Sequence, residues 1–240
     1  MIDFHCHLDL YQEPMKTFRE VNRRNIQVLA VTTSPRAFVQ TSKFFFGSSN
    51  VRVALGFHPE LVAQRPSEKK QFFEQMRYTR FIGEIGLDGS QRAKGTLLEQ
   101  KSFFIEVLRS TALYGGKIIS IHSRGAVKEV LQTLETYKGD YIPILHWFTG
   151  STTEAQRAIR LGCWFSINPN MCFTNTGKRI ISCIPIDRVL PETDGPFAQI
   201  DGMPYVPWDT TVIEYLAKEN NMKLLEMDEL LSHNLKKLLG

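Results

Sequence analysis

The first residues that point to chemistry are two histidines near the N-terminus, in the segment Asp3-Phe4-His5-Cys6-His7. Residues two apart in a strand face the same side, so His5 and His7 would aim their imidazoles at one point. Imidazole is a common ligand of zinc and of similar transition metals. One His-x-His pair is a weak signal by itself, and it gains weight only if other ligand types reach the same place.

Four further residues with metal-binding side chains follow short apolar runs. Glu84 is set among isoleucines and glycines, where a carboxylate needs a cation or a hydrogen-bonding partner. His122 and His146 each end an apolar run, and Asp194 precedes a Gly-Pro pair. Taken singly, each has an ordinary structural explanation: a salt-bridged Glu, a core His, or an Asp that forms a turn or caps a helix.

Taken together, the six residues indicate a metal centre. A catalytic zinc site usually has three protein ligands, so six ligands favour two ions. The two oxygens of Glu84 would bridge ions about 3.5–4 Å apart. Histidine suits zinc, whereas carboxylates also accept manganese or magnesium. The expected cofactors are therefore two divalent metal ions, with Zn, Mg and Mn as the candidates. The predicted metal ligands are His5, His7, Glu84, His122, His146 and Asp194.

The elements that must position these residues are eight short β-rich runs, apolar on both faces like strands of a buried parallel sheet. Each predicted ligand lies at or near the C-terminal end of one run, which is where a barrel of alternating strands and helices carries its active site. The expected strands are Ile2–Leu8, Ile26–Thr32, Val51–Gly56, Phe81–Leu87, Lys117–His122, Tyr141–Phe148, Cys163–Ile167 and Val189–Thr193.

Helical stretches alternate with these runs. The clearest is Thr96–Leu113, where apolar residues recur at three- and four-residue steps, and Ser151 with Glu154 fits a capping box before another. Eight alternations predict an α/β protein with a (β/α)8 TIM-type barrel, and an open doubly wound sheet is the alternative. The proline-containing segment Asp194–Asp209 is expected to be a loop, and one domain is expected over residues 1–240. The other expected helices are Pro14–Arg24, Pro35–Phe46, Ser67–Tyr78, Ala126–Thr136, Thr152–Arg160, Gly177–Cys183, Thr210–Asn220 and Met227–Leu239.

Composition agrees with a barrel-sized globular protein and argues against a membrane or disulfide-stabilised one. The 240 residues are 42% hydrophobic and 22% charged, and the net charge of +4 is compatible with an anionic substrate. Four cysteines without a Cys-x-x-Cys pair favour a reducing compartment. Asp3, His5 and His7 interrupt any signal-peptide core, and no apolar run approaches the ~20 residues of a membrane span. We therefore expect a cytoplasmic protein without a membrane partner.

With these motifs, the sequence resembles the TatD family of metal-dependent deoxyribonucleases, within the amidohydrolase-like barrels. The matches occur in the family's order along the whole chain, and as a set they are specific. They are Phe4-His5-Cys6-His7-Leu8-Asp9, Gly56-Phe57-His58-Pro59, Ile82-Gly83-Glu84-Ile85-Gly86-Leu87-Asp88, His122-Ser123-Arg124, His146-Trp147-Phe148-Thr149-Gly150, Glu192-Thr193-Asp194-Gly195-Pro196 and Asn234.

The resemblance also implies roles for individual residues. Asp194 would orient or deprotonate the attacking water, and Glu84 would bridge the metals. His58 and Arg124 would contact substrate phosphate, although by residue type alone His58 also suits a loop cap and Arg124 a surface ion pair. The implied ligands are His5, His7, Glu84 and Asp194 for the first metal, and Glu84, His122 and His146 for the second.

The chain departs from the family pattern in several places, which makes it a divergent member. Gly89-Ser90 stands where the family usually has an aromatic residue, and the stretch 199–204 lacks an Arg that the family usually has, which puts one phosphate contact in doubt. Trp147 stands in place of a common Cys and suits either base stacking or packing at the barrel top. The segment 166–170 on the seventh strand is also unusual for the family.

The opening segment, Ile2–Tyr11, is similar to the TatD-like component of Qat-type anti-phage defence systems. That similarity implies protein partners in a bacterial defence complex and leaves the oligomeric state open.

Three functions follow as hypotheses. The leading one is metal-dependent hydrolysis of DNA phosphodiesters, in single strands or at ends, without base-sequence specificity. The second is C–N or C–O hydrolysis of a small molecule, as in amidohydrolases, whose bridging carboxylated Lys has no counterpart at the end of the fourth strand. The third is a metal-stabilised, non-catalytic subunit of a larger assembly.

Overall fold

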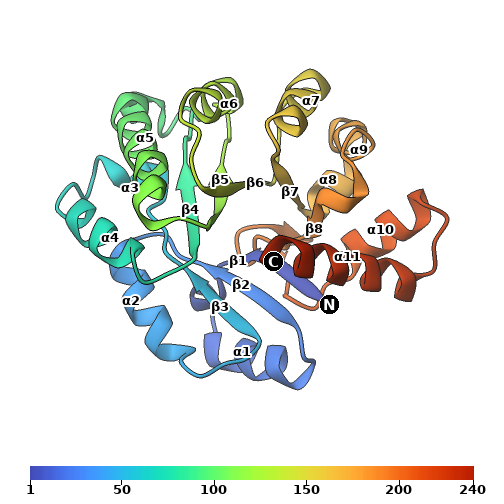
Figure 1. Cartoon of the computed structure of the whole chain (residues 1–240). Helices are drawn as coiled ribbons and strands as arrows, with labels where there is room; N and C mark the ends of the chain where they lie inside the picture. Colours follow the sequence, from blue (N-terminus) through green and yellow to red (C-terminus); the bar gives the residue numbers. More distant parts are fainter.

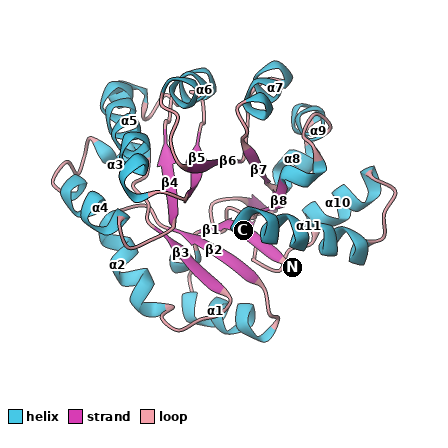
Figure 2. Cartoon of the chain, in the orientation of Figure 1, coloured by secondary structure: helices cyan, strands magenta, loops and turns pink.

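Eight parallel strands form the centre of the computed structural model, which describes residues 1–240 (Figure 1). Neighbouring strands pair in chain order, from β1 to β3 and from β4 to β8. Helices lie outside this ring of strands, and loops join the two layers (Figure 2). The strands are β1 Ile2–Cys6, β2 Gln27–Val31, β3 Val51–Ala54, β4 Phe81–Gly86, β5 Lys117–His122, β6 Tyr141–His146, β7 Trp164–Ile167 and β8 Val189–Pro191.

Two seams close these strands into a barrel. Between β3 and β4, Leu55 pairs with Ile82, and the Gly83 amide donates to the Leu55 carbonyl at 2.9 Å. Between β8 and β1, the Asp194 amide donates to the His5 carbonyl at 2.8 Å. The (β/α)8 barrel prediction is confirmed, and the open-sheet alternative is wrong.

The interior of the barrel changes from apolar to polar along its axis. Ile118, Ile144 and Leu190 belong to one buried apolar cluster. Residues at even steps along a strand share a face, so His122 and His146 lie on the same faces as Ile118 and Ile144, nearer the C-terminal ends. The apolar layer therefore supports a polar layer at the end of the barrel where the predicted ligands lie.

The helices largely follow the expected periodicity, and the capping box of Ser151 and Glu154 is confirmed. Two short helices, α3 and α8, were not expected. Each follows a side-chain cap, His58 or Asn168, and begins at a proline, which is a start signal too local for periodicity to detect. The helices are α1 Pro14–Arg23, α2 Pro35–Phe44, α3 Pro59–Val62, α4 Glu68–Met76, α5 Leu97–Tyr114, α6 Val127–Thr136, α7 Thr152–Arg160, α8 Pro169–Phe173, α9 Asn175–Ile181, α10 Thr211–Glu219 and α11 Leu224–Leu239, with short 3-10 turns η1 Leu8–Leu10, η2 Lys94–Thr96 and η3 Ile186–Arg188.

The segment Asp194–Asp209 differs from the expected loop because it contains a two-stranded hairpin, β9 Gln199–Ile200 with β10 Met203–Pro204. The connecting residues Asp201 and Gly202 have φ values of 50° and 78°. An Asp-Gly pair adopts such angles in tight hairpin turns, so this dipeptide was a usable signal.

Several strands end earlier than expected. β1 ends at Cys6, so His7 lies beyond the strand at the start of η1. β6 ends at His146 because Trp147 has a φ of 36° and leaves the extended conformation. The predicted ligands therefore lie at strand ends and in the first residues of the following loops.

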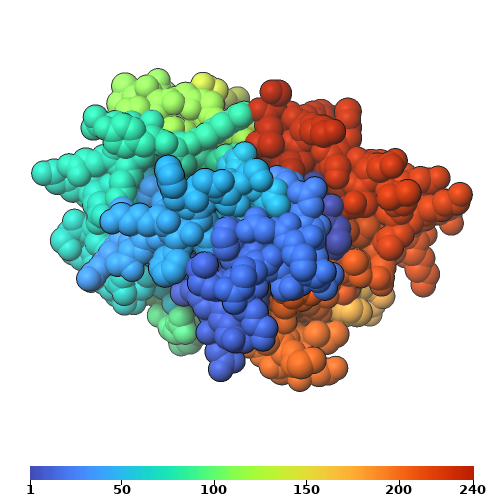
Figure 3. Space-filling model, turned by 90° about the horizontal axis from the view of Figure 1, so that it is seen from below, coloured from blue at the N-terminus to red at the C-terminus, as the bar shows by residue number.

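The chain termini meet on one side of the molecule. The N-terminal amino group lies 3.3 Å from Asp228 of α11, and the N-terminal residues lie beside the C-terminal helices in Figure 3. None of the helices combines the length and the apolar character that crossing a membrane requires.

Candidate metal centre and active site

A cavity of about 880 Å3 opens at the C-terminal ends of the strands. Only three of its 18 lining residues are hydrophobic, so it suits a polar ligand. Seven of the eight site residues named from the sequence line it, and the eighth, His5, is fully buried beside His7 and His146. The seven are His7, His58, Glu84, His122, Arg124, His146 and Asp194.

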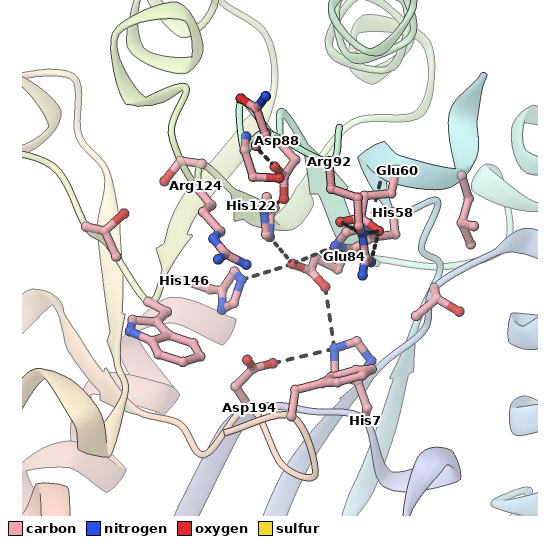
Figure 4. Close-up of a pocket in the computed structure, with 18 residues that line it drawn as sticks. His7, His58, Glu60, Glu84, Asp88, Arg92, His122, Arg124, His146 and Asp194 are labelled. Carbon is pink, nitrogen blue, oxygen red and sulfur yellow. Dashed lines mark hydrogen bonds and ion pairs between the residues drawn. The ribbon is translucent and has the colours of Figure 1, made fainter. Parts of the chain in front are cut away.

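Glu84 lies at the centre of the cluster, and its Oε2 atom faces His7 (Figure 4) and the buried His5. Glu84 Oε2 lies 3.8 Å from His5 Nε2 and 3.4 Å from His7 Nε2. Asp194 Oδ1 lies 3.5 Å from each of the same two nitrogens. These four atoms form the first potential ligand group.

The spacing of this group fits a divalent cation. Zinc bonds of about 2.0–2.1 Å in a tetrahedral site place ligand atoms about 3.4 Å apart, close to the distances observed. His5 Nε2 is buried and has no hydrogen-bond partner, although it points between Glu84 and Asp194. An unpartnered buried polar atom is unfavourable unless something binds it, so the donor set fits a metal.

The other carboxylate oxygen of Glu84 faces a second group. Glu84 Oε1 lies 2.6 Å from His122 Nδ1 and 3.0 Å from His146 Nε2. The two oxygens of one carboxylate thus face two different sets of histidines, as expected for a bridging ligand. The structure brings together all six predicted ligands, and their roles as ligands stay predictions.

His58 approaches the same oxygen but presents a different atom. Its Nε2 lies 3.7 Å from Glu84 Oε1, while its Nδ1 accepts a hydrogen bond from the Glu60 amide at 3.3 Å and caps α3. Nδ1 is an acceptor here, so the neutral ring carries its proton on Nε2. Burial keeps the pKa of His58 below its usual value, which favours that neutral form. His58 therefore caps the loop with Nδ1 and turns Nε2, as a donor, toward Glu84 and the cavity.

Three groups outside the predicted set hold the histidines in place. Asp88 Oδ2 lies 2.9 Å from His122 Nε2, and Ser120 Oγ lies 2.8 Å from His5 Nδ1. Glu192 Oε1 lies 3.4 Å from His146 Nδ1 and accepts the Trp147 amide at 3.0 Å. Each contact engages the ring nitrogen opposite the one that faces Glu84. Such partners fix the tautomer and orientation of metal-binding histidines.

We expect Asp88→Asn and Glu192→Gln to weaken metal binding by about 10- to 100-fold, because each removes the charge that orients a histidine. Titration of the metal-free variants with zinc or manganese measures the change. Glu135→Gln is the control, because Glu135 pairs with Arg157 at an exposed site outside the cavity. Affinities equal to that of the control would show that Asp88 and Glu192 only stabilise the fold.

Electrostatics favours the metal-binding forms of His5 and Glu84, whereas the three other histidines of the cluster have raised pKa values and favour the protonated form. Burial, and after it the positive charge of His146, hold the pKa of His5 well below its usual value. Burial opposes the charge on Glu84, but the surrounding histidines outweigh it and hold the Glu84 pKa well below normal. Burial likewise opposes a charged His7, but hydrogen bonds with Asp194 and Glu84 raise the His7 pKa to about 9. Metal binding there would displace a proton.

Two glycines allow the backbone to approach closely at the site. A Cβ atom on Gly86 would lie 2.1 Å from the His122 carbonyl oxygen, so only glycine lets β4 and β5 meet there. A Cβ atom on Gly195 would lie 1.9 Å from the Tyr11 hydroxyl. Asp194 itself has a φ of 52°, a region that Asp tolerates better than most residues.

Arg124 and Trp147 complete the cavity wall. Arg124 is exposed, and its guanidinium makes no hydrogen bond or ion pair, so the surface ion-pair explanation is wrong. Trp147 lines the cavity and also packs against the apolar core.

Asn234 lies away from the cavity. Its side-chain amide donates to the carbonyls of Ile186 and Val189 at 2.7 and 2.9 Å, beside the start of β8, which is a structural role.

Comparisons with known proteins agree with the cluster of potential metal ligands. The family model described as TatD related DNase matches residues 2–240. An uncharacterized metal-dependent hydrolase of Buchnera aphidicola is 29% identical over 92% of this chain and 89% of its own. The human protein named Deoxyribonuclease TATDN3 is 27% identical over 99% of this chain and 94% of its own.

Solved structures show the same fold. The crystal structure of YJJV, a TatD homolog from Escherichia coli, superposes with a TM-score of 0.81 at 21% identity and covers 100% of this chain and 97% of that one. Because the family model spans nearly the whole sequence, this chain belongs to the TatD-related family of metal-dependent hydrolases.

Proposed function

We propose that this protein hydrolyses phosphodiester bonds of DNA, in single strands or at free ends, with two divalent ions. The observation that carries the proposal is the unpaired guanidinium of Arg124 beside the ligand cluster in a polar cavity. The human relative named Deoxyribonuclease TATDN3, which aligns with this chain over nearly the whole length of both, supports the same assignment. An unpaired cation next to bound metals suits a phosphate, whose charge both would neutralise.

The residues divide the chemistry between them. His5, His7, Glu84 and Asp194 would hold one ion, and Glu84, His122 and His146 the other. Divalent ions there would supply Lewis-acid polarisation of the phosphate and lower the pKa of water. The Asp194 carboxylate, through the oxygen that does not hold the ion, would accept the proton of the attacking water. Arg124 and the Nε2–H of His58 would hold the phosphate oxygens in line for attack.

Hydrolysis of amides or lactones is less well supported. A bridging carboxylated lysine would have to enter the cavity, and no lysine lines it. Lys117, at the start of β5, donates its amino group to the carbonyls of Met76 and Thr79 instead. The partners in a bacterial defence complex stay a prediction.

We expect two equivalents of metal per chain, because the cluster contains two ligand groups that share Glu84. Elemental analysis after reconstitution with excess zinc or manganese measures this. Stoichiometry that saturates at one equivalent under those conditions would contradict the two-metal model.

We expect Arg124→Ala to leave metal content unchanged and to lower kcat/KM on DNA by roughly 10- to 150-fold, the range for one charge-assisted hydrogen bond. Arg160→Ala removes the same charge from an exposed position in the last turn of α7, outside the cavity, and should behave as wild type.

The test of the function is a cleavage panel of single-stranded DNA, RNA, amides and lactones, each with added Mg2+, Mn2+ or Zn2+. Metal-dependent cleavage of DNA that falls in Arg124→Ala and not in Arg160→Ala supports the proposal. Faster turnover of any amide or lactone than of both nucleic acids would overturn it.

A further inference from the structure

A second guanidinium faces the cavity, on a segment to which the sequence motifs assign no role. Arg92 lies in the loop between β4 and α5, and its side chain lines the cavity together with Glu60 of α3. Arg92 Nε lies 3.0 and 3.1 Å from the two Glu60 carboxylate oxygens, and its Nη2 donates to Glu60 as well. The pair thus joins the loop after β4 to the short helix after β3.

The ion pair leaves Arg92 with free donors. Nη1 makes no hydrogen bond, and the Arg92 side chain is 80% exposed whereas that of Glu60 is 17% exposed. Glu60 is therefore the anchored partner, and the guanidinium extends into the open part of the cavity. A guanidinium has five N–H donors in a planar fork, so the edge that Glu60 does not use remains available to another oxyanion.

Arg92 and Arg124 lie on opposite sides of the ligand cluster. In Figure 4, His122 and Glu84 lie between the two guanidinium groups. These are the only Arg or Lys side chains that line the cavity. A strand with several phosphates offers negative charge on both sides of His122 and Glu84, whereas a single diester carries one charge.

We propose that Arg92, positioned by Glu60, binds a phosphate next to the one that is cleaved, so that the site prefers a strand of several nucleotides to an isolated diester. This inference rests on the proposed function, since it requires a nucleic-acid substrate. Because the ion pair with Glu60 already orders the Arg92 side chain, less conformational entropy is lost when a phosphate binds. A lysine would keep the charge without the planar fork.

The test compares Arg92→Ala and Arg92→Lys with wild type on two substrates, a single-stranded DNA of about ten nucleotides and bis(p-nitrophenyl) phosphate. For Arg92→Ala we expect kcat/KM on the DNA strand to fall at least ~10-fold. The fall in kcat/KM on bis(p-nitrophenyl) phosphate should be clearly smaller. Arg92→Lys should lose part of this preference. Arg157→Ala, which breaks a comparable ion pair between α6 and α7, is the matched control.

Binding gives a second readout that does not depend on turnover. With metal chelated, affinity for the same strand is measured over a range of salt concentrations. Removing one phosphate contact lowers the slope of log K against log[salt] by about 0.7 for single strands. A pair that only fastens the loop would leave that slope unchanged.

The possible results distinguish failure of the proposed role of Arg92 from failure of the proposed nuclease function. DNA cleavage by wild type, with Arg92→Ala losing equally on both substrates or matching Arg157→Ala, would overturn the role of Arg92 and leave the nuclease assignment intact. Absence of cleavage of any nucleic acid by the metal-loaded wild type would overturn the proposed function, and the inference with it.

Discussion

Replacing Glu84 by Gln is expected to abolish hydrolysis, with a loss of at least ~10²-fold, as for removal of one essential acid–base group. The two oxygens of Glu84 face different histidine groups, at 3.4 Å from His7 and 2.6 Å from His122. An amide keeps one oxygen and carries no charge, so it can serve one group at most. We therefore expect the metal content of Glu84→Gln to fall below that of wild type together with the activity.

The control for this variant is the same exchange at Glu135, which is exposed and pairs with Arg157. Glu135→Gln should keep full activity and metal content. Circular dichroism and thermal unfolding of Glu84→Gln check that the barrel is intact. Full activity of Glu84→Gln after treatment with chelator and reloading with metal would remove Glu84 from the mechanism.

The barrel, and the clustering of the ligand side chains at the C-terminal ends of its strands, could be predicted from the sequence because both depend on local sequence patterns. Each apolar run stops where a side chain enters the polar cavity, so the strand end and the chemical group coincide, as at His122 and His146. Parallel strands bring their C-terminal ends to one face. Six residues far apart in the chain were thus expected to be close in space without any knowledge of their contacts.

The partners behind the ligands could not be predicted because they depend on register and on pairings across the barrel. Asp88 reaches His122 because Gly86 lies opposite His122 in the ladder of β4 and β5. Glu192 follows β8, yet it contacts His146 at the end of β6 and Ser166 of β7. Nothing in the local sequence around Asp88 or Glu192 indicates these neighbours.

The residues proposed to contact substrate were harder to predict, because they lie in loops whose paths the sequence does not indicate. Arg92 lies in a loop without hydrophobic periodicity, so its position over the cavity follows only from its ion pair with Glu60. For His58 the sequence suggested a phosphate contact or a loop cap, and the structure explains why the two are compatible. Nδ1 serves the backbone and Nε2 faces the cavity.

Asp194→Asn is expected to reduce kcat by at least ~10²-fold, because in the proposed mechanism Asp194 accepts a proton from the attacking water. The exchange suits the site, since Asn has the same shape and also tolerates the left-handed φ of 52°. The hydrogen bond from the residue 194 amide to the His5 carbonyl does not involve the side chain, so the seam between β8 and β1 should persist.

The matched control is Asp201→Asn, which makes the same exchange at a φ of 50° in the exposed hairpin turn between β9 and β10. Asp201 does not line the cavity, so this variant should retain wild-type turnover. Single-turnover cleavage of labelled DNA under saturating metal separates proton transfer from metal loss, because excess metal compensates for a weakened ligand but not for a missing base. Recovery of wild-type kcat by Asp194→Asn at high metal concentration would reduce Asp194 to a ligand and require another group to accept the proton.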